Sequence, residues 1–500
     1  MEKLVLHGKN LTHEQVQEVA RKGRQVSIAD EAQNKLEEGR KLIYELMEQG
    51  VPMYGCNTGV GWNKDVLITD ELLERFNRGM LHSHAIGLAP FASEEEGRAI
   101  LLLRLNTLLV GCTGISTYIP AMYVEFLNRG ITPLIPTRGS VGQADIGLLS
   151  FVGLAMIGIG DVYYKGEVVK AAQALKVEGL EPIALGPKDG LAIISSNAAG
   201  AGTAAIAVQA AKELVESAEL IYCMSLEGLN GNTTPLKLAS LEKRGFPFPH
   251  QSGEKMAAHL KGSSLYEADP ARPLQDPLSF RNGAHLHGEA RRAIEKAKEQ
   301  LEIQFNYSDD NPCLNLDDRT VSSCSNFDPL PWVIELQALS ITLSHLSKAA
   351  CMRILKLINP GFTGGLARNL QPSPAVMAFT TIHKTYSVLD AEIRNLCNPV
   401  SMDSFAISGE MEDISTNSPL VVQNLKKIID NLRYILGIEL IMAAQAIDLR
   451  KEKGITLGAN TKAAHEKFRT HVSFYDDDTR IVMEDIQKAR DLIMNGELVF

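Results

Sequence analysis

The sequence predicts a mainly α-helical protein, with an amino-terminal lobe that carries loops and a carboxy-terminal bundle of long helices. Glycine-rich stretches interrupt the shorter helical segments of the first 200 residues. After about residue 197, long helical patterns dominate, at 200–228, 284–305, 331–357, 373–396 and 419–449. We therefore expect two parts, a lobe over residues 1–196 and a helix bundle over residues 197–500.

The lobe begins with a helix and a loop. Residues 28–49 are amphipathic, with Ser27 or Asp30 near the start of the helix. Three glycines in "VPMYGCNTGVGW", residues 51–62, then break the periodicity and predict a loop. A second helix is expected over residues 93–110.

Two further segments complete the lobe. The apolar run at 146–159 is shorter than the ~20 residues needed to cross a bilayer, so it predicts a buried helix. Residues 162–185 hold the one plausible β element, a hairpin.

The bundle is expected to contain unusually long helices. The segment 419–449 opens with Pro419 near its first turn, a position that proline favours. At 1.5 Å per residue, a helix of about 30 residues is about 45 Å long. Several of these segments are apolar nearly all round, which indicates burial inside a bundle or between subunits.

The composition argues against several classes of function. A formal net charge of -10 argues against nucleic acid or an anionic membrane as the main partner. The first residues turn polar too soon for a signal sequence, so we expect a cytoplasmic protein. Seven cysteines without a CxxC motif predict free thiols. His285 and His287 are two residues apart and would point to different faces of a helix, so we predict no metal site.

Five polar, irregular stretches interrupt the helices. Each alone could be an ordinary loop, but their order and spacing resemble the histidine and phenylalanine ammonia-lyase superfamily over nearly the whole chain. The stretches are "MYGCNTGVG" (53–61), "GSVGQADIG" (139–147), "IISSNAAG" (193–200), "QDPLSFRNG" (275–283) and "ISGEMEDISTNS" (407–418).

The resemblance implies roles for three residues of the lobe and its border. "MYGCNTG" places Tyr54 as the catalytic base. A tyrosine ordinarily has a pKa near ~10, so this role requires positive charge or hydrogen bonding that lowers it. "HSHAIG" gives His84 a place at the pocket, and "SSNAAG" matches the family at Asn197, with Ala198 where the family has glycine.

"QDPLSFR" matches a family segment that binds the substrate. It keeps Gln275 and Arg281 but has Leu278 in place of a family tyrosine. The resemblance implies that Arg281, assisted by Asn197, holds a substrate carboxylate through its planar guanidinium. An intersubunit salt bridge is the alternative role for Arg281, and a structural hydrogen bond is the alternative for Gln275.

Three more matches complete the expected pocket. "YSDDNPCL" and "SNFDP" align Asn311 and Phe327 with family residues, and "GEMED" aligns Glu412, which could accept N–H bonds from a heterocyclic ring. Lys384 could contact a sulfur atom on the heterocycle of a substrate, if negative charge develops on that sulfur during the reaction. A core ion pair of Lys384 with Glu410 or Glu412 is the equally sensible alternative.

The chain departs from the family where the electrophile belongs. The family forms a methylidene-imidazolone ring from Ala-Ser-Gly, but here Gln143 and Ala144 stand in that place, followed by Asp145. No central serine can lose water, so the resemblance implies a member that uses no ring cofactor. Asp145 would face the leaving group, or else serve as a helix N-cap.

A lyase without the ring needs a substrate whose nitrogen already leaves easily. A quaternary ammonium departs as neutral trimethylamine, so the substrate should be a betaine of an aromatic amino acid. This combination resembles the ergothionases, which split ergothioneine, the 2-thiohistidine betaine, into thiourocanate and trimethylamine. By the same resemblance we expect a homotetramer with sites shared between subunits. Hercynine elimination, ordinary histidine ammonia-lyase activity and a catalytically silent homologue are the alternatives.

Overall fold

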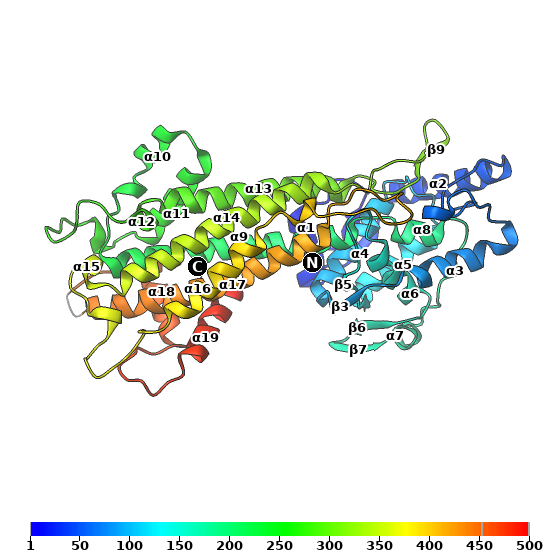
Figure 1. Cartoon of the computed structure of the whole chain (residues 1–500). Helices are drawn as coiled ribbons and strands as arrows, with labels where there is room; N and C mark the ends of the chain where they lie inside the picture. Colours follow the sequence, from blue (N-terminus) through cyan, green and yellow to red (C-terminus); the bar gives the residue numbers. More distant parts are fainter. Residues whose placement is uncertain (1, 452–453, 499–500) are drawn as a thin grey trace. The chain divides into compact units, whose positions relative to one another are not determined.

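The computed structural model describes residues 2–451 and 454–498, and 60% of the protein is helical (Figure 1). This confirms the predicted mainly α class. The chain divides into two compact units, each assembled from separate segments. Unit 1 comprises Met1–Val208, Ala297–Leu336 and Pro399–Gln423, and unit 2 comprises Gln209–Lys296, Gln337–Asn398 and Asn424–Phe500. The units thus differ from the contiguous ranges 1–196 and 197–500, because the long helices carry the chain from one unit to the other and back.

Eight helices lie wholly within unit 1. They are α1 His13–Lys22, α2 Asp30–Glu48, α3 Leu73–His84, α4 Glu94–Leu108, α5 Tyr118–Arg129, α6 Ile146–Met156, α7 Ala171–Glu178 and α8 Asp189–Ile194. The start of α4 shows why such segments begin where they do: the Ser93 hydroxyl accepts the N–H of Glu96, and the Glu96 carboxylate accepts the N–H of Ser93. Helices α3, α6 and α8 pack on one another. The core between these three helices holds in place segments that line a cavity.

Unit 1 also contains four small sheets. Strands β1 and β2 are parallel, β3 pairs with β5, β6 lies between β4 and β7 and pairs with both, and β8 pairs with β9. Their bounds are β1 Leu4–Leu6, β2 Val26–Ile28, β3 Leu88–Phe91, β4 Thr132–Pro133, β5 Pro136–Arg138, β6 Asp161–Tyr164, β7 Glu167–Lys170, β8 Cys313–Asn315 and β9 Thr320–Ser322. The predicted hairpin is confirmed as β6–β7, with Asp161 opposite Lys170. The expectation of a single β element is wrong, because strands of two to four residues are too short to show alternation in the sequence.

The remaining helices belong to unit 2 or run between its segments and those of unit 1. They are α9 Ala198–Leu229, α10 Leu238–Arg244, α11 Pro247–His259, α12 Leu278–Arg281, α13 Gly283–Asn306, α14 Leu330–Leu357, α15 Pro360–Thr363, α16 His383–Leu396, α17 Ser418–Lys451, α18 Ala459–Arg469 and α19 Val482–Met494. Short 3₁₀ turns lie at Gly61–Asn63, Asp70–Leu72, Thr234–Leu236, Ser264–Tyr266, Arg368–Leu370 and Val400–Met402.

Four of the five predicted long helices agree with the structure to within a few residues, and Pro419 lies in the first turn of α17. The exception is the segment predicted at 373–396, whose helix α16 begins only at His383. Pro374 lies at the start of the predicted segment, and a residue that precedes proline is disfavoured in helical geometry.

One stretch, Asp189–Leu229, is long and apolar enough to cross a membrane by length and composition. Its most apolar window is completely buried inside the protein. Such burial is what a core helix requires, since a helix that is apolar all round must be covered on every side. The shorter apolar run at 146–159 forms the buried helix α6, as predicted.

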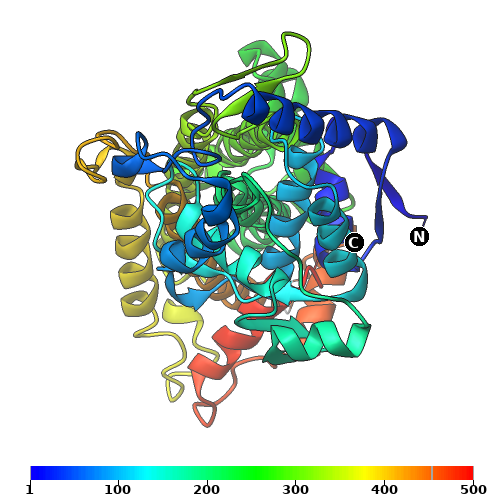
Figure 2. The same cartoon turned by 90° about the vertical axis from the view of Figure 1, so that its right-hand side faces the viewer.

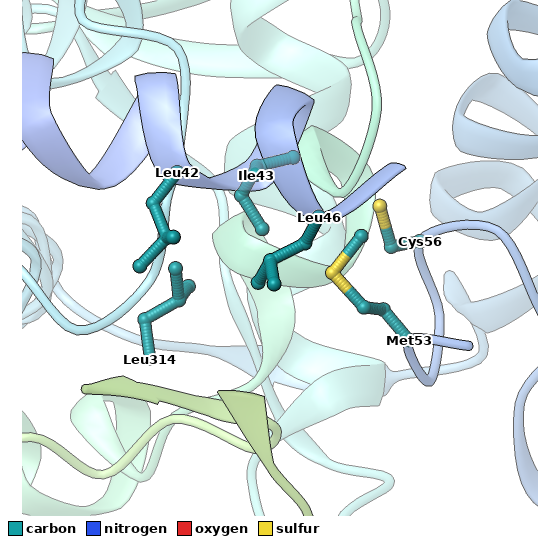
Figure 3. Packing of buried hydrophobic residues seen from close by; sticks show 6 residues of the cluster. All are labelled: Leu42, Ile43, Leu46, Met53, Cys56 and Leu314. Carbon is teal, nitrogen blue, oxygen red and sulfur yellow. The ribbon is translucent and has the colours of Figure 1, made fainter. Parts of the chain in front are cut away.

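A hydrophobic cluster in unit 1 fixes the loop that follows α2 (Figure 3). Side chains of α2 meet the loop and strand β8 in it, and hairpin β8–β9 lies beside α2 in Figure 2. The cluster consists of Leu42, Ile43, Leu46, Met53, Cys56 and Leu314. Full burial of an apolar side chain of this size stabilises a fold by about 1.5–3 kcal/mol. Because Met53 and Cys56 are anchored, the backbone of Tyr54 between them is held in place.

Candidate active site

A cavity of about 1140 Å³ opens within unit 1. This volume is slightly above the range of about 300–1,000 Å³ that is typical of ligand pockets, so the cavity has room for a small molecule. Four of the five polar stretches identified in the sequence contribute to its wall. The lining residues lie within 54–84, 143–146, 191–195, 311–327 and 408–412.

Tyr54 lies on the cavity wall in a loop that stabilises itself. The Asn57 side chain accepts the N–H of Met53 at 2.7 Å and donates to the carbonyl of Val51 at 2.9 Å. The phenol oxygen of Tyr54 accepts the backbone N–H of Gly61 at 2.9 Å. The loop therefore presents the phenol at the cavity together with its own hydrogen-bond donor.

The electrostatics at Tyr54 differ from the expectation. Burial raises the pKa of Tyr54 above its ordinary value, the Gly61 N–H lowers it, and the negative charge of Glu412 raises it further. The net direction is upward, so the predicted lowering is wrong for the protein without substrate. The phenol is protonated at neutral pH, and a base role requires positive charge that offsets the effects of burial and Glu412.

His84 and Asn311 line the same cavity. His84 Nδ1 lies 2.8 Å from the carbonyl oxygen of Met80, which can only accept, so Nδ1 is the donor in this contact. The Oδ1 atom of Asn311 accepts the N–H of Cys324 at 2.9 Å. Both side chains are thus held by backbone groups at the wall.

Phe327 and Glu412 also reach the cavity, and Glu410 does not. The Oε1 atom of Glu412 accepts the Ser408 hydroxyl at 2.7 Å. Glu412 lies in a turn closed by a bridge between Ile407 and Glu412. The structure therefore favours Glu412 over Glu410 as the acidic residue that can meet a ligand here.

Asn197 lies directly behind this wall, fully buried. Its Nδ2 donates to the carbonyl of Phe327, and its backbone N–H donates to Asp309 at 2.9 Å. Its Oδ1 has no hydrogen-bond partner among the described residues. Asn197 therefore holds Phe327 in place and keeps one acceptor unsatisfied, rather than standing in the lining itself.

A buried group of charges supports the turn that carries Asn197. Asp309 accepts the Ser196 hydroxyl at 2.7 Å and pairs with Arg104 at 3.2 Å. Asp310 pairs with Lys188 at 2.6 Å. These charged side chains are almost wholly buried, and removing one partner of such a pair typically costs 3–5 kcal/mol. The paired aspartates of "YSDDNP" were a usable sequence signal for this network, but the sequence analysis gave Asp309 and Asp310 no role.

The loop before α6 does not fit the ring that the superfamily forms. Gly142 has φ +83°, and a Cβ there would lie 2.5 Å from the Ser418 hydroxyl, so only glycine is accommodated. The Ser140 hydroxyl donates to Asp145 at 2.8 Å and accepts the N–H of Gly142 at 3.0 Å. Gln143 and Ala144 face the cavity in the place of the ring. No serine stands where one would have to lose water.

Asp145 is buried and does not line the cavity. Its carboxylate accepts the Ser140 hydroxyl and the Gly200 N–H, the latter at 2.7 Å. It occupies the N-cap position of α6 without a side-chain cap bond. The expected contact with a leaving group is therefore corrected: both carboxylate oxygens are used to hold the loop against α9.

The pH dependence of stability should report on Asp145. Burial, partly offset by the Gly200 and Ser140 hydrogen bonds, raises its pKa from 3.8 to about 6. A carboxyl with a raised pKa contributes stability that is present at low pH and lost as pH rises through about 6. We expect this contribution to fall by about 2 kcal/mol between pH 4 and pH 7.

Asp145→Asn should remove the pH-dependent part of the stability. Urea unfolding midpoints of the variant and of wild type across this pH range would measure the difference. A wild-type-to-variant difference that stays constant with pH would contradict the assignment.

Three predicted residues belong to unit 2 and do not line the cavity. Gln275 and Lys384 are exposed, and Arg281, at the end of α12, is partly buried. The roles of these three residues at the substrate therefore stay predictions.

The cavity also contains residues that sequence reasoning missed. Trp62 and Phe76 add aromatic surface to the wall, and Gln143 adds an amide whose Nε2 is buried without a partner among the described residues. Trp62 lies against Gly409, where a Cβ would overlap the indole ring. One of only two tryptophans in the chain lies in a glycine-rich loop, and this was a usable signal for Trp62. Nothing in the local pattern marked Phe76.

Comparison with known proteins identifies the family to which this fold belongs. The family model described as aromatic amino acid lyase matches residues 11–470. The chain belongs to the aromatic amino acid lyase family. A histidine ammonia-lyase of Treponema denticola is 34% identical to this lyase over 98% of the chain and 96% of the relative.

Solved structures agree with the family. The crystal structure of ergothionase from Treponema denticola, in complex with desmethyl-ergothioneine sulfonic acid, is 42% identical, with a TM-score of 0.97 and complete coverage of both chains. A tyrosine aminomutase from Streptomyces globisporus is 28% identical with a TM-score of 0.93, over 99% of this chain and 98% of that one. Family and neighbours together support carbon–nitrogen lyase chemistry for this lyase.

Proposed function

We propose that this lyase eliminates trimethylamine from ergothioneine to give thiourocanate, without an electrophilic ring cofactor. The observation that carries the proposal is the loop from Gly139 to Asp145, which keeps its place at the cavity but presents Gln143 and Ala144 where a ring would have to form. The 42% identity to a solved ergothionase supports the same substrate class.

The proposed chemistry needs a base, a carboxylate clamp and contacts to the heterocycle. Tyr54 takes the β-proton once the fixed positive charge of the betaine offsets the effects that raise its pKa. The electrons form the carbon–carbon double bond as the C–N bond breaks, and trimethylamine leaves neutral. Arg281 holds the carboxylate, Glu412 accepts a ring N–H, and Lys384 meets the sulfur as negative charge develops there.

The proposal places Gln275, Arg281 and Lys384 in the site from neighbouring subunits of a homotetramer. Helix α14 supports self-association, since its large exposed apolar residues fall on one stripe at helical spacing. These residues are Leu330, Ile334, Ile341 and Leu355. We further propose that the enzyme works in the cytoplasm, whose reducing conditions suit its seven free cysteines.

Three rival functions remain as alternatives. The sequence relatives named histidine ammonia-lyase favour release of ammonia from histidine, but the loop at Gln143 lacks the serine that their ring requires. Hercynine, the betaine without sulfur, would satisfy the same leaving-group argument. A catalytically silent homologue would bind a betaine and release nothing.

The deciding experiment gives the purified protein ergothioneine, hercynine or histidine in separate reactions. Absorbance follows the conjugated acrylate product, and mass spectrometry follows trimethylamine or ammonia. We expect turnover with ergothioneine, and a Lys384→Met variant should lose about 10-fold or more in kcat/KM for it, since a hydrogen bond to a charged group contributes about 1.5–3 kcal/mol. Lys462→Met, which removes an exposed lysine that pairs with Glu466, is the matched control.

Each of the other outcomes would favour one of the rival functions. A preference for hercynine, with Lys384→Met unaffected, would keep the elimination and remove the sulfur contact. Ammonia from histidine would contradict the ring-free reaction, and tight binding without turnover would favour the silent homologue.

A further inference from the structure

Two cysteines that the proposed reaction does not use meet beside the cavity. Cys112 follows helix α4, and Cys313 begins strand β8. The N–H of Leu314 donates to the carbonyl of Cys112 at 2.8 Å, which joins the two backbone segments. The Cys313 thiol donates to the carbonyl of Leu314 at 3.6 Å, and the thiols of Cys112 and Cys313 are near enough that each shifts the pKa of the other. Both side chains are partly exposed, so small solutes have access to the pair.

The pair is chemically asymmetric. The hydrogen bond from Cys313, with a second from Ser308, lowers the pKa of Cys112 to about 7 in spite of partial burial. The pKa of Cys313 is raised, because its proton is held by the neighbouring thiolate. Burial instead raises the pKa of the other thiols, which are Cys56, Cys223, Cys324, Cys351 and Cys397. Cys112 is therefore the reactive thiolate, and Cys313 is positioned as its resolving partner.

We propose that Cys112 and Cys313 form a reversible disulfide site that reacts with low-molecular-weight disulfides such as glutathione disulfide. The Cys112 thiolate attacks one sulfur of the external disulfide, which gives a mixed disulfide and releases one thiolate. That thiolate takes the Cys313 proton. The Cys313 thiolate then attacks the Cys112 sulfur and releases the second glutathione. One external disulfide is reduced to two thiols while the two cysteines are oxidised.

The position of the pair connects it to the cavity. Cys313 lies two residues after Asn311, which lines the cavity, and directly before Leu314. Leu314 packs in the same hydrophobic cluster as Met53, the neighbour of Tyr54 (Figure 3). A covalent bond that draws Cys313 against Cys112 therefore acts on both sides of the wall, through Asn311 and through the Tyr54 loop. The inference rests on this geometry and not on the identity of the substrate.

The test is a redox titration of the full-length native protein in glutathione buffers. After acid quenching and alkylation of free thiols, peptide mapping by mass spectrometry identifies each disulfide. We expect a Cys112–Cys313 disulfide that reduced glutathione reverses. Cys313→Ser should instead trap glutathione on Cys112, and Cys112→Ser should form neither product. Cys397→Ser, which removes a partly buried thiol of unit 2, is the control and should behave as wild type.

A second measurement keeps the inference testable if a variant folds poorly. At pH 7 the wild-type protein should alkylate at Cys112 about three- to fivefold faster than an ordinary thiol, since the larger thiolate fraction outweighs the lower nucleophilicity. The midpoint of this rate against pH should rise in Cys313→Ser. A folded protein that forms no disulfide in oxidising buffer, pairs Cys313 with Cys324, or shows no preferential alkylation at Cys112 would overturn the proposal.

Discussion

Tyr54→Phe should lower kcat for ergothioneine by about 10²–10⁴-fold while KM changes little, because the substitution removes a general base and keeps the aromatic ring. The phenol oxygen is the only atom lost, and it is the acceptor of the Gly61 N–H at the cavity wall. The acrylate product and trimethylamine, measured over a range of substrate concentrations, separate kcat from KM.

Tyr44→Phe is the matched control for that measurement. Tyr44 lies on α2, and its exposed hydroxyl accepts a hydrogen bond from Arg40 at 3.1 Å, outside the cavity lining. It should retain the wild-type rate. Retention of more than about a tenth of wild-type kcat by Tyr54→Phe would remove Tyr54 as the base.

Mixed assemblies of two inactive variants should recover activity. Arg281→Met alone is expected to lose about 10- to 100-fold in kcat/KM, because a charged contact to the substrate carboxylate disappears. If Tyr54 and Arg281 of one site come from different chains, random assembly of Arg281→Met with Tyr54→Phe leaves about a quarter of the sites with both residues intact. Co-expression with two affinity tags isolates the mixed assemblies for assay.

Co-expression of Tyr54→Phe with Tyr54→Ala is the control, since no combination of those chains restores the phenol. Recovery near a quarter of wild-type activity would support sites shared between subunits. Absence of recovery in well-folded mixed assemblies would mean that Arg281 serves the Tyr54 of its own chain or does not bind substrate.

The long helices were predictable because their signal is local and repeated over many turns. Apolar periodicity sets α9, α13, α14 and α17 within a few residues of their ends. The small sheets were not, since pairs such as β1 with β2 or β4 with β6 join strands of two to four residues that lie far apart in the sequence. The start of α16 was misplaced because proline chemistry outweighs helical periodicity over those residues.

The candidate site was predictable to the extent that motifs mark it. Tyr54, His84, Asn311, Phe327 and Glu412 converge on one cavity from distant parts of the sequence. No sequence motif, in contrast, indicated how the side chains around Tyr54 and Asp145 pack. Burial and a nearby carboxylate decide the direction of the Tyr54 pKa, and the turn of the chain decides that Asp145 points into the core. These properties depend on which segments lie close in space, and a sequence pattern does not reveal that.

The protonated resting state of Tyr54 makes the proposed substrate a participant in its own activation. A quaternary nitrogen carries a charge that no change of pH removes, and it brings this charge into a pocket where Glu412 and burial hold the proton on the phenol. Recognition and switching-on then become one event. In such a lyase, Tyr54 stays protonated when a neutral molecule enters the cavity and acts as a base only after a cationic substrate has bound. Selectivity for betaines then depends on this activation as well as on the shape of the cavity.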